Sequence, residues 1–259
     1  MLKGKLALVT GSTSGIGLGI ARALAAQGSD VVLNGFGEPD AIEALRTEIA
    51  GTHGVTVRYE GGDLSKPADI EALMTRCAAH GGVDILVNNA GIQHTSPIES
   101  FPPERWDAVI ALNLTSAFHT TRLALPTMKA RNWGRIVNIA SAHGLVASVE
   151  KSAYVAAKHG IVGLTKVTAL ETARTGVTCN AICPGWVLTP LVQKQIDARM
   201  ASMGLTADQA RDALLGEKQP SGAFVTPEQL GALAAFLCSP AGEQVRGAAW
   251  AMDGGWTAQ

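Results

Sequence analysis

Short apolar runs alternate with longer amphipathic stretches along most of this chain. The runs are nearly continuous, which is typical of parallel strands that are covered on both faces. The stretches between them place apolar residues at helical spacing. This pattern predicts seven strands, at residues 6–9, 30–33, 55–59, 84–88, 135–139, 177–183 and 248–252.

The predicted helices lie between these strands, at residues 16–27, 41–52, 67–80, 103–131, 152–174 and 227–238. Alternating strands and helices with right-handed crossovers build an α/β fold, a doubly wound (Rossmann) domain around a seven-stranded parallel sheet. No repeat or flexible linker divides the chain, so we expect one domain over residues 1–259. Residues 190–218 are polar and amphipathic without a strand signal, and we expect them to form a helical lid over the substrate cleft.

Composition narrows the choice of partners. The chain is 47% hydrophobic with a net charge of −1, so it has no electrostatic attraction to nucleic acid or an anionic membrane. No apolar run approaches the roughly 18 residues that span a bilayer, and the N-terminus lacks a signal-peptide pattern, so we expect a cytoplasmic protein. The spacing of Cys77, Cys179, Cys183 and Cys238 fits neither a disulfide framework nor a zinc site, and we expect no catalytic metal.

A glycine-rich turn at residues 10–17 follows the first strand and opens the first helix. Glycines let the backbone approach a pyrophosphate, and the helix N-terminus offers free N–H groups and a positive dipole end to it. The alternative is a tight turn whose glycines serve packing only. The position between strand and helix favours a dinucleotide site.

The end of the second predicted strand bears on the choice of dinucleotide. Residues 34–37 read Asn-Gly-Phe-Gly, with neither an acid for a ribose hydroxyl nor a base for a 2′-phosphate. Phe36 could fill the space that the phosphate needs, so NAD is favoured. Asp63 follows the third strand and could accept from the adenine amine or cap the next helix. The backbone at residues 184–187, after the sixth strand, could bind a nicotinamide carboxamide.

Candidate chemistry centres on Tyr154 and Lys158. Residues four apart share one face of a helix, and a nearby ammonium lowers a tyrosine pKa from its ordinary value near ~10. The resulting phenolate is a general base for an alcohol proton. Ser141, thirteen residues before Tyr154 at the end of an apolar run, can hydrogen-bond the same substrate oxygen.

Together these motifs resemble the short-chain dehydrogenase/reductase family over essentially the whole chain. The matching residues are the turn at 10–17, Asn88-Asn89-Ala90-Gly91, Asn113, Ser141, Tyr154, Lys158 and Pro184-Gly185. The resemblance implies direct hydride transfer to or from a nicotinamide, and a homotetramer. It makes Tyr154 the general base, with Lys158 lowering its pKa and binding the nicotinamide ribose. It makes Ser141 the holder of the substrate oxygen and Asn113 the anchor of a water in the proton relay. The implied cofactor contacts are Gly11, Thr13, Ser14, Gly15, Ile16, Gly17, Phe36, Asp63, Leu64, Asn89, Ala90, Gly91, Tyr154, Lys158, Pro184, Gly185, Val187 and Thr189.

A narrower resemblance concerns the substrate. Residues 88–94, 141–148, 151–154, 183–187, 217–220 and 253–256 are similar to those of family members that oxidise (R)-3-hydroxybutyrate to acetoacetate with NAD⁺. Several donors, one of them a cation, suit a carboxylate. The implied substrate contacts are Gln93, Ser141, His143, Lys151, Tyr154, Gln195 and two apolar walls, Trp186 and Trp256. Taken singly, Lys151 reads as a solvated lysine, His143 as a loop histidine and the tryptophans as packing residues.

Two other functions fit the same fold. An NADPH-dependent 3-oxoacyl thioester reductase would leave His143 and Lys151 without a purpose, since its substrate has no carboxylate near the reacting carbon. A nucleotide-sensing protein without catalysis would have no need for the intact set of Asn113, Ser141, Tyr154 and Lys158.

Overall fold

The sheet of this protein is parallel throughout. The computed structural model describes residues 1–258, apart from the side chain of Leu191; Gln259, part of the predicted domain, lies outside the described residues. Within the described chain, seven strands pair in the order β3-β2-β1-β4-β5-β6-β7, which confirms the predicted doubly wound sheet. The strands are β1 Leu6–Val9, β2 Asp30–Leu33, β3 Val57–Tyr59, β4 Ile85–Asn88, β5 Gly134–Ile139, β6 Val177–Pro184 and β7 Ala249–Met252.

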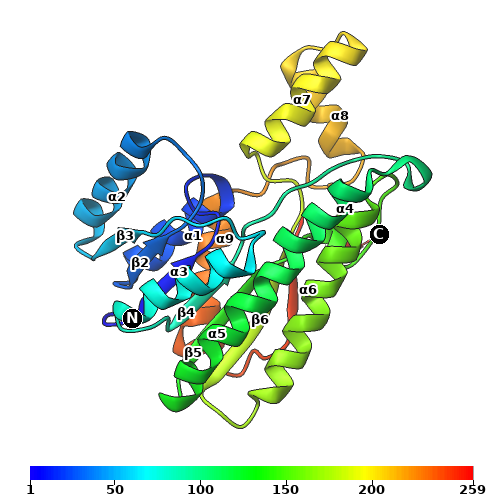
Figure 1. The fold of residues 1–259 in the computed structure, drawn as a ribbon. Helices are drawn as coiled ribbons and strands as arrows, with labels where there is room; N and C mark the ends of the chain where they lie inside the picture. Colours follow the sequence, from blue (N-terminus) through cyan, green and yellow to red (C-terminus); the bar gives the residue numbers. More distant parts are fainter. Residues whose placement is uncertain (259) are drawn as a thin grey trace.

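Helices cover both faces of the sheet (Figure 1). The described helices of the two layers are α1 Gly15–Ala26, α2 Pro39–His53, α3 Pro67–Ala79, α4 Pro103–Ile110, α5 Ser116–Ala130, α6 Ser152–Glu171 and α9 Pro227–Cys238. Successive strand residues point to opposite faces. Ala7 and Val9 of β1 therefore share one core with α1 and α9, whereas Leu6 and Leu8 share another with α3 and α5. This double burial explains why the strands read as unbroken apolar runs.

The predicted helix over residues 103–131 contains a π-helical turn. The turn, η2 (Ala111–Thr115), joins α4 to α5 without a loop. Such turns insert a residue into the helix and frequently mark functional sites. Asn113 lies at its centre and is 2% exposed, so the turn carries a buried amide toward the carboxyl edge of the sheet.

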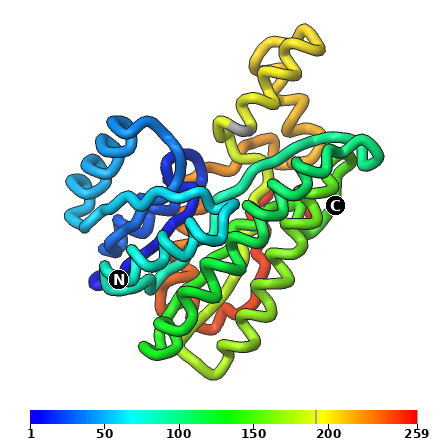
Figure 2. The backbone as a smooth tube through the Cα atoms, in the orientation of Figure 1, coloured from blue at the N-terminus to red at the C-terminus, as the bar shows by residue number. Residues whose placement is uncertain are grey.

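Residues 190–218 leave the sheet between β6 and α9. Two helices, α7 Pro190–Met203 and α8 Ala207–Gly216, rise from the carboxyl edges of the strands (Figure 1), and Figure 2 follows the backbone out into this pair and back. Thr189 caps α7 by accepting a hydrogen bond from the Val192 N–H, Pro190 follows it, and Gly204 ends the helix in the left-handed conformation. The apolar sides of the two helices pack on Trp186 and Trp256.

The structure also bears on membrane association. Among the helices of residues 1–258, none combines the length and the apolar character that crossing a bilayer requires.

Candidate active site

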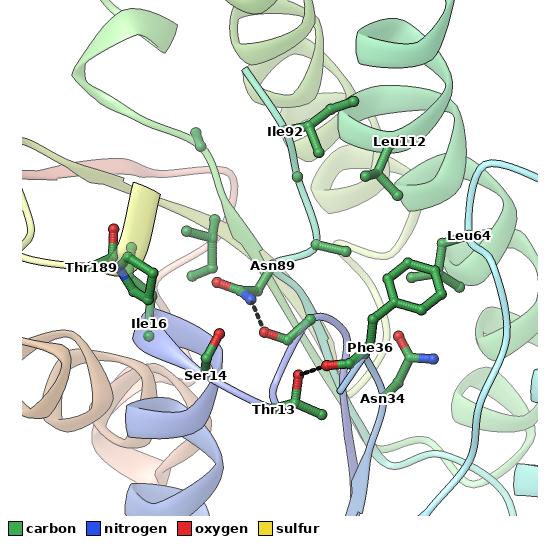
Figure 3. Close-up of a pocket in the computed structure, with 18 of the residues that line it drawn as sticks. Thr13, Ser14, Ile16, Asn34, Phe36, Leu64, Asn89, Ile92, Leu112 and Thr189 are labelled. Carbon is green, nitrogen blue, oxygen red and sulfur yellow. Dashed lines mark hydrogen bonds between the residues drawn. The ribbon is translucent and has the colours of Figure 1, made fainter. Parts of the chain in front are cut away.

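A cavity of about 420 Å³ opens at the carboxyl edge of the sheet, between β1 and β4. The strand order reverses at this point, which is where doubly wound folds bind their ligands. The predicted cofactor contacts that line the cavity are Gly11, Thr13, Ser14, Gly15, Ile16, Phe36, Leu64, Asn89, Ala90, Gly91, Tyr154, Lys158 and Thr189. Figure 3 labels seven of them: Thr13, Ser14, Ile16, Phe36, Leu64, Asn89 and Thr189. The prediction missed Asn34, Gly35, Gly62, Ile92, Leu112, Ile139, Ala140 and Pro190. Asn34, Gly35 and Ala140 come directly after strands β2 and β5, and that position was the signal available for them in the sequence.

The glycine-rich turn suits an anion because its glycines carry no side chains and the helix that follows it begins without a side-chain cap or an acid. Gly11 has φ +61°, and a Cβ there would lie 2.9 Å from the Ala90 Cα, so the turns after β1 and β4 touch. Ser14 precedes α1 without a side-chain cap, and the first turn of the helix holds no acid. The N–H groups at this helix end are thus available to a pyrophosphate.

Gly17 serves the turn differently from the prediction. It is buried and does not line the cavity; a Cβ there would lie 2.5 Å from the Asn89 Nδ2. That amide nitrogen donates to the Thr10 and Gly11 carbonyls, at 2.8 and 2.9 Å. Gly17 therefore lets α1 pack against the junction of the two turns, and its contact with the cofactor stays a prediction.

The backbone after β2 is held by two hydroxyls. Thr13 Oγ1 donates to the Phe36 carbonyl at 2.8 Å, and Tyr59 Oη donates to the Gly35 carbonyl at 2.7 Å. The Phe36 ring is 75% exposed and lines this end of the cavity together with Leu64 (Figure 3). Among the described residues that line the cavity, Lys158 alone carries a formal charge. The end near Phe36 is thus electrically neutral.

Asp63 corrects a prediction. Its carboxylate accepts hydrogen bonds from the N–H and the hydroxyl of Ser65, at 3.0 and 2.7 Å, and lies 3.4 Å from Lys66 Nζ. These partners, the Ser65 hydroxyl first, lower the pKa of the carboxyl group. The side chain does not line the cavity, and Lys66 stands at the N-cap of α3. Asp63 therefore closes a turn before α3 and does not cap the helix. Its contact with adenine stays a prediction.

The four predicted catalytic residues come from three parts of the chain: Tyr154 and Lys158 line this cavity, whereas Ser141 and Asn113 do not. Tyr154 and Lys158 lie on α6, Ser141 follows β5, and Asn113 lies in η2. Lys158 Nζ donates to the Ile139 carbonyl at 2.7 Å and lies 5.6 Å from the centre of the Tyr154 ring. The Ser141 hydroxyl accepts from the His143 N–H at 3.1 Å.

Both ends of the Asn113 side-chain amide form hydrogen bonds with the backbone of Ile92. Its Oδ1 accepts from the Ile92 N–H at 2.8 Å, and its Nδ2 donates to the Ile92 carbonyl at 2.9 Å. These two hydrogen bonds to the Ile92 backbone hold the segment that follows Asn89-Ala90-Gly91 in place. The side chain thus acts first as a clamp on a wall of the cavity.

The pKa of Tyr154 departs from the prediction. Burial raises the pKa of the phenol, and a hydrogen bond with the Ser141 hydroxyl opposes that rise. Lys158 is itself buried, which lowers its pKa to about 8, and its ammonium is turned to the Ile139 carbonyl. The net shift is therefore opposite to the predicted one, because burial is the larger influence on the phenol. The lowering of the tyrosine pKa by Lys158 stays a prediction.

A second, smaller cavity of about 90 Å³ adjoins the first at Tyr154. Of the predicted substrate contacts, it is lined by Gln93, Ser141, His143, Tyr154, Trp186, Gln195 and Trp256. Pro184, Gly185 and Val187, predicted to contact the cofactor, line this cavity and not the first one, while Thr189 lines both. The loop after β6 therefore forms the border between the two cavities.

Aromatic rings enclose the small cavity. The His143 ring meets the rings of Tyr154 and Trp256 edge-on, at 5.9 and 5.0 Å between centres, and Trp186 lies 5.5 Å from Trp256. Burial, and then the charges of Lys151 and Lys218, lower the pKa of His143 to about 4. At neutral pH the imidazole is therefore uncharged, and it shares a hydrogen bond with the Ser148 hydroxyl at 2.9 Å.

Lys151 lies beyond Trp186, outside the small cavity. It lines a third cavity of about 610 Å³ that also borders Trp186, Gln195 and Trp256. Its ammonium is 5.2 Å from the centre of a Trp186 ring, within the range of a cation–π contact. Burial, followed by the charge of Arg199, lowers its pKa to about 8. The sequence predicted that Lys151 lies near the substrate, but it did not predict that the Trp186 ring lies between Lys151 and the small cavity.

Metal ligands do not gather in the described part of the chain: residues 1–258 hold no group of three His, Cys, Asp or Glu side chains that could bind an ion.

A cleft with a neutral far end that runs to a half-buried tyrosine and a buried lysine is the arrangement expected of a nicotinamide-dependent oxidoreductase. A family model described as short chain dehydrogenase matches residues 5–200, and the chain belongs to that family.

Two relatives extend the comparison over the full chain. A D-beta-hydroxybutyrate dehydrogenase of Cupriavidus necator is 69% identical, with 100% of both chains covered. A second protein of the same description, from Rhizobium meliloti, is 55% identical, with 98% of this chain and 99% of its own covered.

Solved structures share the fold. An L-sorbose reductase from Gluconobacter frateurii in complex with NADPH and L-sorbose superposes with a TM-score of 0.94 at 30% identity, covering 100% of this chain and 98% of its own. A variant actinorhodin polyketide ketoreductase with NADPH gives 0.91 at 37% identity, with 98% of both chains covered.

Proposed function

We propose that this enzyme oxidises (R)-3-hydroxybutyrate to acetoacetate with NAD⁺, reversibly. The observation that carries the proposal is the small aromatic cavity, which has Tyr154 and Ser141 on one side and the amide and imidazole groups of Gln93, Gln195 and His143 around it. Its volume of about 90 Å³ suits a four-carbon acid better than a long acyl thioester. The two relatives described as D-beta-hydroxybutyrate dehydrogenases support the same substrate.

The glycines of the turn, Gly11 and Gly15, and the first cavity, which reaches from Phe36 to Tyr154, fit a dinucleotide. When bound, the nicotinamide supplies the hydride acceptor for oxidation and the donor for reduction. Tyr154 then removes the hydroxyl proton during oxidation and returns it during reduction. Ser141 orients the substrate oxygen toward Tyr154. We propose that Lys158 holds the nicotinamide ribose and favours the phenolate through its charge.

Asn113 enters the proton path indirectly. Both ends of its side-chain amide already bind the Ile92 backbone. We therefore assign the anchoring of a relay water to its backbone carbonyl, in the π-helical turn where the regular hydrogen-bond pattern is broken.

We assign the binding of the substrate carboxylate to the groups opposite Tyr154. Gln93 and Gln195 offer amide donors, and neutral His143 offers one ring N–H at most. We propose that Lys151 moves past the edge of Trp186 to supply the charge. Gln195 lies on α7, so the proposed lid at 190–218 would bring this donor down over the substrate as it closes.

Replacing Lys151 with methionine is expected to raise the KM for (R)-3-hydroxybutyrate by about 10- to 100-fold, the range for a lost charge-assisted hydrogen bond. The turnover number and NADH affinity should change little, because Lys151 lines neither the first cavity nor the small one. Steady-state kinetics measures the effect. The matched control is Lys194→Met, an exposed lysine on α7 that lines none of the three cavities.

The proposed contact between Lys151 and the substrate carboxylate also predicts that the KM depends on pH. With its pKa lowered to about 8, Lys151 is charged at pH 7 and loses its charge as pH rises above 8. The KM of the unmodified enzyme should therefore climb between pH 7.5 and about 9.5, whereas that of Lys151→Met should stay flat. Parallel profiles for the two proteins would rule out Lys151 as the carboxylate partner.

Support for NAD over NADP comes from the far end of the first cavity. A 2′-phosphate beyond the end of β2 would meet Gly35 and Phe36, and the one charged residue that lines the described cavity, Lys158, lies at the catalytic end. The NADPH of the two solved neighbours belongs to proteins only 30 and 37% identical to this chain.

One assay tests the whole proposal. The (R) and (S) forms of 3-hydroxybutyrate and a 3-hydroxyacyl thioester are each offered with NAD⁺ and with NADP⁺, and reduced cofactor is followed by absorbance. Turnover confined to the (R) acid with NAD⁺ is the expected result. Preference for the thioester with NADP⁺ would favour the reductase function, and no turnover at all would favour a nucleotide-binding role.

We also propose assembly into a homotetramer. Apolar side chains are exposed on α5 and α6, namely Phe118, Val167 and Leu170, and a second group forms where Phe236 stacks on Trp250 at 5.5 Å between ring centres. Two separate apolar faces support two kinds of subunit contact. Sedimentation equilibrium measures the mass, and a monomer at micromolar concentration would contradict the proposal.

A further inference from the structure

Gln219 is a polar residue in an apolar place. It follows α8 by three positions and is 1% exposed. Its Oε1 accepts from the Trp186 N–H at 2.7 Å, and its Nε2 donates to the Ala223 carbonyl. Its own N–H donates to the Leu215 carbonyl at 2.7 Å. A buried amide of this kind is costly unless each end is bound, so these bonds hold the side chain in one position.

Two glycines make room for this side chain. A Cβ at Gly185 would lie 2.5 Å from Gln219 Oε1, and a Cβ at Gly254, which has φ +60°, would lie 2.6 Å from Gln219 Cγ. Gly185 belongs to the loop after β6, and Gly254 to the loop after β7. The amide is thus wedged between two loops that leave the sheet at neighbouring strands.

Each of these loops carries one tryptophan of the small cavity. Trp186 is bound directly by Gln219. Trp256 is set by Asp253, whose carboxylate accepts from the Gly255 N–H at 3.1 Å and from the Thr257 N–H at 2.9 Å. The Ser221 N–H, two residues after Gln219, donates to the Gly254 carbonyl at 3.0 Å. Three segments therefore meet at Gln219: the end of α8, the Trp186 loop and the Trp256 loop.

We propose that Gln219 is a positioning residue that ties the α7–α8 pair to both tryptophan walls of the small cavity. It touches neither reacting groups nor the first cavity. If α8 moves, the hydrogen bonds from Leu215 to Gln219 and from Gln219 to Trp186 move Trp186 with it. The position of the helix pair and the shape of the small cavity therefore change together. The inference rests on the proposed function, because the cavity it shapes is the proposed substrate site.

The test compares two isosteric changes in buried amides. Gln219→Met removes both side-chain bonds while it keeps the volume. Asn180→Leu is the matched control: Asn180 is 1% exposed, and its amide also bridges two backbone groups, the Val245 carbonyl at 2.6 Å and the Ala248 N–H at 3.1 Å, but it lies in mid-strand away from the cavities. Both variants should lose thermal stability. We expect only Gln219→Met to raise the KM for (R)-3-hydroxybutyrate, by about tenfold, with the dissociation constant of NADH within about twofold of the unmodified value.

A conservative variant separates positioning from general damage. In Gln219→Glu, the protonated acid can still accept from Trp186 and donate to Ala223, whereas the ionised acid faces the Ala223 carbonyl with a charge. Its KM should approach the unmodified value near pH 5.5 and rise toward pH 7.5, a range in which Lys151 stays charged. A KM without this slope, or one that Asn180→Leu raises equally, would overturn the inference.

A readout without substrate keeps the two proposals apart. Protein labelled with 5-fluorotryptophan gives fluorine resonances that single Trp→Phe variants assign. Gln219→Met should shift or broaden those of Trp186 and Trp256 and leave that of Trp133 unchanged. Unmoved Trp186 and Trp256 resonances would refute the role of Gln219 even in an active enzyme, whereas shifted ones with no turnover of the (R) acid would leave it standing and refute the substrate.

Discussion

Replacement of Tyr154 with phenylalanine is expected to lower kcat for (R)-3-hydroxybutyrate by about 10³- to 10⁴-fold, at the upper end for a lost acid–base group. Tyr154 lines both the nucleotide cavity and the small cavity, so it lies where the proposal brings substrate and cofactor together. The ring stays in place in the variant, and its edge-on contact with His143 should be kept. Steady-state kinetics gives kcat, and NADH fluorescence gives the cofactor affinity, which should be nearly unchanged.

Tyr59 provides the contrast for this prediction. Its hydroxyl holds the Gly35 carbonyl at the opposite end of the nucleotide cavity. Tyr59→Phe should therefore weaken NAD⁺ binding by a few-fold and leave kcat within about twofold, in keeping with the loss of one neutral hydrogen bond. A Tyr154→Phe enzyme that keeps more than a tenth of the unmodified kcat would exclude Tyr154 as the general base.

Replacement of Lys158 with methionine is expected to lower kcat by about 100- to 1,000-fold and to shift its pH dependence. In this structure burial raises the pKa of Tyr154, so oxidation needs a positive charge nearby to make the phenolate accessible. Removal of the ammonium raises the tyrosine pKa further. The rise of the oxidation rate with pH should then move to higher pH, as a profile from pH 6 to 10.5 would record.

Lys166→Met is the matched control, because Lys166 lies on the same helix and is exposed. It should reproduce the unmodified profile. Since Lys158 Nζ also holds the Ile139 carbonyl, circular dichroism and NADH binding must first establish that Lys158→Met is folded. A folded variant with an unshifted profile would mean that Lys158 does not tune Tyr154.

The order of elements and the location of the site could be predicted from the sequence. Strands buried on both faces must be apolar throughout, as Leu6–Val9 is, and helices between them leave one chirality of crossover. Ligand groups in such a fold follow the strands, which is why the turn at Gly11, the segment at Asn89 and Ser141 lie at one edge.

Details that depend on the nearest neighbour could not be predicted. Asp63 follows a strand as an adenine ligand would, yet in the fold its carboxylate binds Ser65 and Lys66. Gln219 carries no pattern in the sequence, because its burial depends on two glycines 34 residues before and 35 after it.

What the sequence by itself determined is therefore the sheet, the turn for the nucleotide and the set of groups that meet at Tyr154, because short-range patterning and strand order specify them. Only the tertiary structure decided the electrostatics and the partition of the cleft. Burial raises the pKa of Tyr154, and the Trp186 ring lies between Lys151 and the small cavity. Both facts depend on which residues pack around these side chains and not on spacing along the chain.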